Sequence, residues 1–284
     1  MKKIVCLMAV AMLMAACGQS YEETKRITRE QRREAARQDS AALKIAVVPT
    51  LDCLPLYVAQ QYELYDTIAG GVRLKPFHAQ MDCDEAVSKG RVEGMVTDLV
   101  RVKYLNDHGT PMRVVAKTDA YWLLIGNRNM RIRQPKQLQK KMVAMTRHSA
   151  TDSLTDRVVA MGNLKPQEVF KVQINDVYVR MQMLQNNEMD ALWLAEPLAT
   201  AARIQRHPVI ADSRKMGVQL GVVAFRDQEM QREGRAHQLE LFLKAYHQAC
   251  DSINKYGVKH YRKLLAQYCN VNVSVVDSLS ESRR

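Results

Sequence analysis

Short apolar runs alternate with amphipathic stretches of helical length from residue 43 onward, and this alternation limits the folds open to the chain. The runs expected as strands are 44–48, 72–77, 94–96, 112–116, 122–126, 142–145, 169–172, 191–194 and 222–225. Helices are expected between them at 54–65, 82–89, 98–106, 152–161, 177–185 and 197–205. Strands separated by helices at this spacing predict an α/β fold with parallel sheets built from βαβ units.

The part of the chain that follows residue 42 is long enough for two domains, since it holds roughly 240 residues. A second series of strands and helices opens at Gln134-Pro135. We therefore expect a first lobe at 43–126, a second lobe at 127–221, and a return to the first lobe at 222–284 with C-terminal helices at 238–256 and 261–268. Ligands of open α/β sheets bind at the carboxyl ends of the strands, so a crevice shared by the lobes is expected.

The N-terminal segment has the pattern of an export signal. Lys2 and Lys3 precede an apolar stretch at 4–16 that is too short to span a bilayer, which predicts a signal peptide at 1–16. The sequence LMAAC ending at Cys17 resembles a lipobox, so Cys17 is the expected lipidation site on the periplasmic face of a bacterial membrane. Ordinary secretion is the alternative. Residues 17–42 are highly charged and are expected to form a lipidated, solvated tether.

The chain is basic, with a formal net charge of +12. The segment 127–221 carries fifteen basic and eight acidic residues. A basic balance can indicate nucleic-acid binding, but an exported protein has little access to nucleic acid. Anionic lipid headgroups, an acidic partner surface or plain solvation of helix faces explain the charge instead.

Four cysteines remain after export and lipidation, and they would lie in an oxidising compartment. They are Cys53, Cys83, Cys250 and Cys269, which allow three pairings. Chain order favours the bridges Cys53–Cys83 and Cys250–Cys269. Four buried thiols are the alternative, because free cysteine packs as a small hydrophobe.

Carboxylates follow four successive expected strands of the first lobe, at Asp52, Asp82, Asp98 and Asp119. Acidic groups at one edge of a sheet could line a binding site, although Asp is also a favoured helix N-cap. The neighbouring aromatic residues that could face a planar or cationic ligand, or equally lie in the core, are Tyr57, Tyr121 and Trp193.

The second lobe offers Ser149 and Thr151 just before an expected helix. Hydroxyls and free N–H groups at a helix N-terminus hold anions, although either residue may serve only as the N-cap. Together the two lobes predict a solute with a hydrogen-bond-donor end and an anionic end.

No motif for catalysis is present. The sequence has no glycine-flanked nucleophile, zinc helix motif or phosphate loop. Asp52, Cys53, His78, Asp82 and Cys83 lie near two adjacent strand ends, but their spacing does not match a metal site. We expect no enzyme activity, no cofactor and no metal.

Three passages resemble the periplasmic binding proteins of ABC importers for nitrate, sulfonate or taurine, and thiamine precursors. They are KIAVVP with LPLYVA at 44–59, LQKKMVAM at 138–145, and MDALWLAEP at 189–197, which contains Glu196. The resemblance implies a two-lobed, type II periplasmic-binding-protein-like fold with a helical C-terminal tail. It also implies a monomer that captures a small solute, with Glu196 near it, for an ABC permease. The sequence departs from the family at Lys140, where glycine is usual. An enzyme on the same fold and a surface lipoprotein for protein interaction are the alternatives.

The anchoring hypothesis predicts that Cys17→Ser releases the protein from membranes, because the variant has no thiol to acylate. Fractionation of cells expressing each form, with mass spectrometry of the mature N-terminus, measures the effect. A variant that stays with the membrane, beside a wild type without lipid mass, would contradict the hypothesis.

Overall fold

The structure is a computed structural model of the chain, and it describes residues 21–65, 68 and 70–279. The predicted signal peptide and the lipidation site Cys17 lie outside these residues. The chain divides into two units, Met1–Ala42 and Leu43–Arg284. Within the described ranges, no helix combines the length and the apolar character that crossing a bilayer requires.

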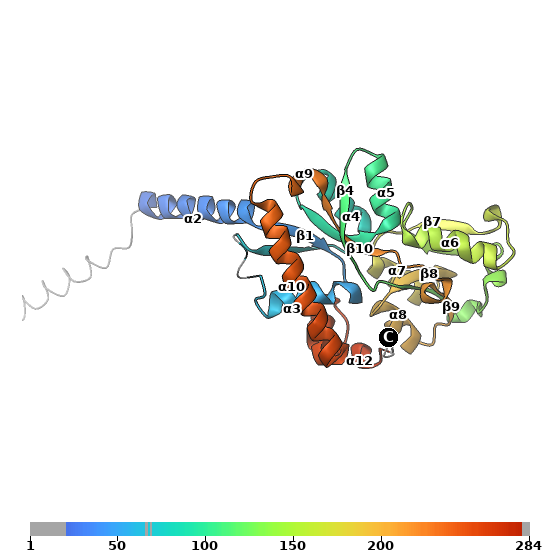
Figure 1. Cartoon of the computed structure of the whole chain (residues 1–284). Coiled ribbons are helices and arrows are strands. Elements are labelled where there is room, and N and C mark those ends of the chain that lie inside the picture. The colour runs from blue at the N-terminus through green and yellow to red at the C-terminus, as the bar shows by residue number, and fades with distance from the viewer. Residues whose placement is uncertain (1–20, 66–67, 69, 280–284) are drawn as a thin grey trace, which may run out of the picture. The chain divides into compact units, whose positions relative to one another are not determined.

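The described part of the first unit, residues 21–42, forms helix α2 (Tyr21–Ala41), where the sequence predicts the tether (Figure 1). Its sequence has no Gly or Pro and is rich in Glu, Arg, Gln and Ala, which have high helix propensity. Arg26 and Glu30 form an exposed ion pair at 3.9 Å, one helical turn apart. Such pairs favour a solvated helix by a few tenths of a kcal/mol each, about 0.3–0.5.

The second unit contains two five-stranded sheets. The first has the order β2-β1-β3-β10-β4 and the second β7-β6-β8-β5-β9. The strands of the first sheet are β1 (Leu43–Val47), β2 (Val72–Pro76), β3 (Gly94–Asp98), β4 (Met112–Lys117) and β10 (Gly221–Arg226). Those of the second sheet are β5 (Trp122–Gly126), β6 (Met142–Met145), β7 (Phe170–Gln173), β8 (Ala191–Ala195) and β9 (Val209–Asp212).

The predicted parallel pairs are present, β1 with β2 and β3 and β6 with β7 and β8, but each sheet also contains antiparallel pairs and is therefore mixed. β10 runs antiparallel between β3 and β4, and β5 runs antiparallel between β8 and β9. The predicted lobe boundary at residue 126 is therefore misplaced, because β5 belongs to the second sheet. An apolar strand can be buried equally well in either sheet, so its own sequence does not indicate which sheet it joins. The short strand β9 was not predicted.

Helices cover both faces of each sheet, and the cores lie between the layers (Figure 1). In the first lobe, α3, α10 and α11 pack on one face, and α4 and α5 pack on the other. In the second lobe, α6 packs on one face, and α7 and α8 pack on the other. The helices are α3 (Leu54–Gln61), α4 (Gln80–Ser88), α5 (Leu99–Asp107), α6 (Ala150–Met161), α7 (Val177–Gln185), α8 (Leu198–Ile204), α9 (Asp227–Met230), α10 (Arg235–Tyr256), α11 (Arg262–Tyr268) and α12 (Val273–Asp277).

The four cysteines of the second unit are all free, so both predicted disulfides are wrong. β1 and β2 are neighbours as expected, but Cys53 and Cys83 belong to different cores on opposite faces of the sheet. Cys53 packs with Cys269 on the α3 side, while Cys83 packs against the other face. Burial raises the pKa of the Cys53 and Cys83 thiols, which keeps them protonated.

Peptide mapping should find all four of these thiols unpaired. In denaturant without reductant, iodoacetamide should alkylate the peptides that contain Cys53, Cys83, Cys250 and Cys269, because no bridge protects them. A disulfide-linked peptide pair in the same digest would contradict the structure.

Candidate binding site between the lobes

The loops that follow the strands of the first sheet meet the corresponding loops of the second sheet in three places. The segment after β1 contacts the end of β8, the segment after β2 contacts the segment after β7, and α5 contacts the start of α6. Because strand carboxyl ends are where α/β sheets bind ligands, this meeting zone is the candidate site.

At the first meeting point, Asp52 lies beside the segment that links the lobes. The N–H of Leu51 donates to the carbonyl oxygen of Glu196 at 2.8 Å. The Asp52 carboxylate accepts from the Thr118 hydroxyl at 3.0 Å and also bonds the Thr50 side chain. Burial raises the pKa of Asp52, and these two hydrogen bonds only partly oppose the shift. The residue as a whole is half-buried.

Glu196 is the second carboxylate at this point, and it is almost fully buried. Its side chain accepts from the Thr200 N–H at 2.8 Å and lies 3.9 Å from the Arg203 guanidinium. Burial raises the pKa of Glu196 despite these partners. Tyr121 is close enough for the charge of Glu196 to raise the pKa of its phenol, after burial as the main cause.

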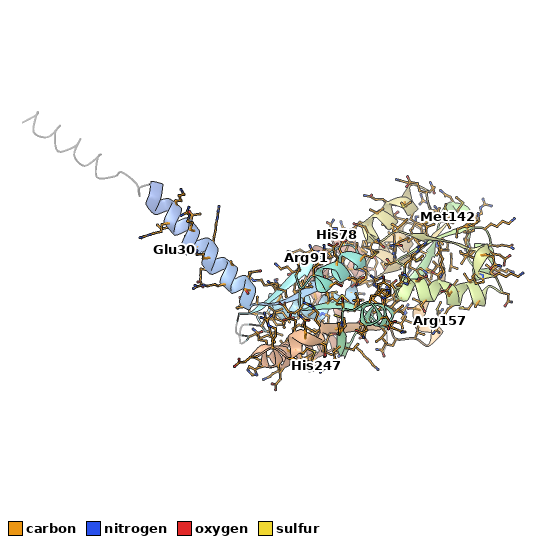
Figure 2. All side chains as sticks on the ribbon, turned by 90° about the horizontal axis from the view of Figure 1, so that it is seen from above. Glu30, His78, Arg91, Met142, Arg157 and His247 are labelled. Carbon is orange, nitrogen blue, oxygen red and sulfur yellow. The ribbon has the colours of Figure 1, made fainter. Side chains whose placement is uncertain are left out.

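At the second meeting point, the backbone joins the lobes. The N–H of Val177 donates to the His78 carbonyl oxygen at 3.2 Å, and Ala79 forms an antiparallel bridge with Asp176. The His78 and Tyr178 rings meet edge to face at a centroid distance of 4.9 Å. Figure 2 shows His78 near the middle of the body, away from Met142 at the outer part of the second lobe.

At the third meeting point, a carboxylate of the first lobe reaches a helix of the second. Asp98 is 4% exposed and caps α5 by accepting from the Arg101 N–H at 2.9 Å. Burial raises its pKa to about 6, although the nearby backbone N–H groups of Arg101 and of Ala150, the first residue of α6, favour the ionised form.

Arg101 ties the same two elements together. Its guanidinium pairs with Asp84 of α4 and donates to the Arg147 carbonyl oxygen of the second lobe at 2.7 Å. The Tyr104 ring stacks on the His148 ring at a centroid distance of 4.5 Å. A buried guanidinium therefore anchors the loop that precedes α6.

A second buried guanidinium supports the strand ends of the second lobe. Arg180 on α7 donates to the carbonyl oxygens of Ile174 and Trp193, at 2.6 and 3.0 Å, and to the Thr146 hydroxyl at 2.6 Å. Burial lowers the pKa of Arg180 to about 10. This single side chain joins the ends of β6, β7 and β8.

The hydroxyls that the sequence assigned to an anion serve their own helix instead. The Ser149 hydroxyl caps α6 by accepting from the Thr151 N–H at 3.2 Å, and it donates to the Thr146 carbonyl oxygen at 2.6 Å. The Thr151 hydroxyl accepts from the Thr146 N–H at 3.0 Å. The structure thus places Ser149 in the N-cap role that the sequence analysis gave as the alternative, while the Thr151 hydroxyl bonds the segment that precedes the helix.

The other predicted ligand residues fall into two groups. Tyr57 and Trp193 are core residues: the Tyr57 hydroxyl donates to the Val48 carbonyl oxygen, and the Trp193 indole donates to the Thr155 hydroxyl at 2.9 Å. Asp82 and Asp119 are exposed. The structure therefore brings Asp52, Tyr121 and Glu196 together at one meeting point and Asp98, Ser149 and Thr151 at another.

Sequence reasoning missed Thr118, Arg101 and Arg180. The two arginines had a readable signal, because each interrupts an apolar stretch of its helix, in LVRVKYL and VYVRMQML. An arginine at a core-facing helix position must find buried acceptors. Thr118 carried no such signal, since its role depends on the linker geometry.

Two residues that are not glycine have a left-handed backbone. Lys140 has φ 58° and His148 has φ 56°, in the region that favours glycine. Lys140 is also the residue that differs from the glycine usual in the proteins that segment 138–145 resembles.

No group of three or more His, Cys, Asp or Glu residues that could hold a metal ion occurs within residues 21–65, 68 and 70–279. Cys53, Cys83, Asp52, Asp82 and His78 therefore do not form a ligand set.

The sequence matches no protein-family model and no curated protein. Solved structures do match. The alkanesulfonate-binding protein SsuA from Xanthomonas axonopodis pv. citri, bound to MOPS, has a TM-score of 0.73 and 16% identity, over 84% of this chain and 82% of that one. The periplasmic nitrate-binding protein NrtA from Synechocystis PCC 6803 has a TM-score of 0.73 and 15% identity, over 83% and 68% of the two chains.

A Candida albicans protein with the generic periplasmic binding protein fold has a TM-score of 0.65 and 14% identity, over 83% of this chain and 79% of that one. These similarities show that the chain has the two-lobed periplasmic-binding-protein fold that its sequence predicts.

The buried charge of Asp98 should make stability depend on pH. Its pKa rises from 3.8 to about 6 on folding, so the folded state binds the proton more tightly. The contribution of Asp98 to the free energy of unfolding therefore falls as the pH rises from about 4 to about 6, by on the order of 2–3 kcal/mol. Asp98→Asn removes this loss and keeps an oxygen for the helix cap.

Urea unfolding at pH 4.5, 5.5 and 7 measures the effect. The unfolding free energy of Asp98→Asn relative to wild type should increase across this series. Asp82→Asn, at an exposed position of α4, controls for the loss of one carboxylate. A constant difference between Asp98→Asn and wild type would show that Asp98 is not a buried charge.

Proposed function

We propose that this protein is a lipid-anchored receptor outside the cytoplasmic membrane that binds a small organic solute between its lobes for an ABC importer. The observation that carries the proposal is the meeting of three pairs of strand-end loops around buried carboxylates. Burying a carboxylate costs folding free energy unless it bonds a hydrogen-bond donor, a cation or a ligand. Asp52 has only hydroxyl side-chain partners at this position, which favours a binding role.

The comparisons support a transport role over the alternatives. Structures of a sulfonate-binding and a nitrate-binding protein share the fold over most of this chain. Because their sequence identity to this chain is low, the small solute and the permease belong to this proposal. It assigns no catalytic residue, because the thiols of Cys53 and Cys83 are buried and protonated.

The solute would lie at the first meeting point. Asp52 and Thr118 would accept from it or orient it, with Tyr121 of the linker and Glu196 of the second lobe beside it. The Arg214 guanidinium lies 4.1 Å from the centre of the Tyr121 ring, and Asp212 pairs with it at 2.7 Å. This ion pair holds Tyr121 in place rather than leaving a free cation for the solute.

Binding would couple to movement of the lobes. The chain crosses between them twice, at 118–121 and 213–220, so these segments form the hinge. Opening would break the Leu51–Glu196 and Val177–His78 backbone bonds. Closure of two lobes about such a hinge is a known way to trap a ligand.

The N-terminal part would serve as anchor and spacer. Cys17 would carry the lipid, and α2 would hold the binding unit off the membrane. A helix of 21 residues is about 30 Å long. That length would leave room for a permease to reach the lobes.

Purified protein should release a small organic molecule on denaturation, detectable by mass spectrometry. Asp52→Asn should then weaken binding of that molecule about tenfold or more, by about 1–3 kcal/mol, because a charged acceptor is lost. Calorimetry on both forms measures the change, with exposed Asp82→Asn as the matched control. Equal affinity of Asp52→Asn and wild type would remove Asp52 from the site.

A further inference from the structure

The chain makes a tight turn where α11 ends and α12 begins. Asn270 has φ 47°, in the left-handed region that is typical of the residue after a helix. The N–H of Val271 donates to the Ala266 carbonyl oxygen at 3.1 Å, and the N–H of Asn270 donates to the Gln267 carbonyl oxygen at 3.3 Å. These two bonds form a Schellman motif, which fixes residues 269–272, the C-terminal turn.

The C-terminal turn is anchored in the first lobe. Cys269 and Val276 are fully buried in the core cluster that also contains Cys53. The helices on either side of the turn, α11 and α12, contact each other. The turn therefore moves with the first lobe when the two lobes separate.

Tyr178 reaches the C-terminal turn from the second lobe. Its hydroxyl donates to the Cys269 carbonyl oxygen at 2.8 Å. The last carbonyl groups of a helix have no partner within the helix, and this bond supplies one of them with a donor. The His78 ring of the first lobe contacts the Tyr178 ring as well. The first turn of α7 is thus held by two segments of the first lobe.

Apolar contact between the lobes continues through Val271. This half-buried side chain packs against the α3 side of the first-lobe core and against the α7 and α8 side of the second-lobe core. Helix α12 also contacts α8 (Figure 1). Val273, two residues further along, packs against the core of the first lobe.

We propose that the C-terminal turn stabilises the closed arrangement of the lobes and thereby raises the affinity for the solute. The turn belongs to the first lobe, whereas Tyr178 and α8 belong to the second, so lobe separation breaks their contacts. Contacts made in only one of two states shift the equilibrium towards that state. The inference rests on the proposed function, in which the solute binds between the lobes.

Tyr178→Phe tests the proposal, because it removes the hydroxyl and keeps the ring that contacts His78. Amide hydrogen exchange of the full chain, followed by NMR, measures lobe opening. The N–H groups of Leu51 and Val177 are the reporters, since each donates to a carbonyl oxygen of the other lobe.

Both reporter amides should exchange about twofold to tenfold faster in Tyr178→Phe, as expected for the loss of one hydrogen bond. Leu51 is distant from residue 178 in the chain, so a change there reports on the lobes rather than on local fraying of α7. Amides of α6 should keep their exchange rates, because the buried face of that helix lies within the second-lobe core.

Tyr261→Phe is the matched control. The Tyr261 hydroxyl bonds the Ser252 hydroxyl at 2.6 Å inside the first lobe, so its loss should leave both reporter amides unchanged. Val271→Ala is a second, independent variant and should also speed exchange at the reporters. Val273→Ala, which trims the neighbouring first-lobe contact, controls for the lost methyl groups.

Unchanged exchange at Leu51 and Val177 in folded Tyr178→Phe and Val271→Ala would overturn the proposal. An equal acceleration in α6 would overturn it too, because it would indicate general destabilisation. Once the solute is identified, both variants should bind it more weakly by a similar factor, and equal affinity would refute the link to binding. The proposed function fails by a different result, namely that wild type releases no organic solute, and the exchange measurement needs no solute.

Discussion

Each sheet is completed by one antiparallel strand that the chain reaches by crossing from the other sheet, and the arrangement of the two lobes depends on these two strands. β10 fills the gap between β3 and β4, and β5 fills the gap between β8 and β9. Without β10, the backbone groups of β3 and β4 would have no partners on that side. The chain must therefore cross between the lobes twice, and the crossings set the carboxyl ends of both sheets against each other.

Buried charge gives this meeting zone its chemical character. Asp98 and Arg101 reach from α5 to the start of α6, while Asp52 and Glu196 lie where β1 meets β8. The three carboxylates accept hydrogen bonds from backbone or hydroxyl groups, and the Arg101 guanidinium donates to a backbone carbonyl oxygen and pairs with Asp84. These partners reduce the free-energy cost of burial without removing it.

The sequence analysis found carboxylates in the right places but not their partners. Asp98 was placed correctly at the end of a strand, and its N-cap role was foreseen. Its place beside Ala150 was not, because the two residues are far apart in the chain and belong to different lobes. Cys53 and Cys83 show the same limit: both follow neighbouring strands, yet they face opposite sides of the sheet.

The sequence by itself determined the elements and the fold class, because apolar periodicity and strand or helix propensity are local properties. Helix α7 occupies the predicted residues, and β1, β6 and β8 differ from their predicted ranges by one residue at most at each end. Only the tertiary structure decided that β5 joins the second sheet, that the four thiols remain free, and that Asp98 lies beside the start of α6. These depend on contacts between residues far apart in the chain, which no local pattern records.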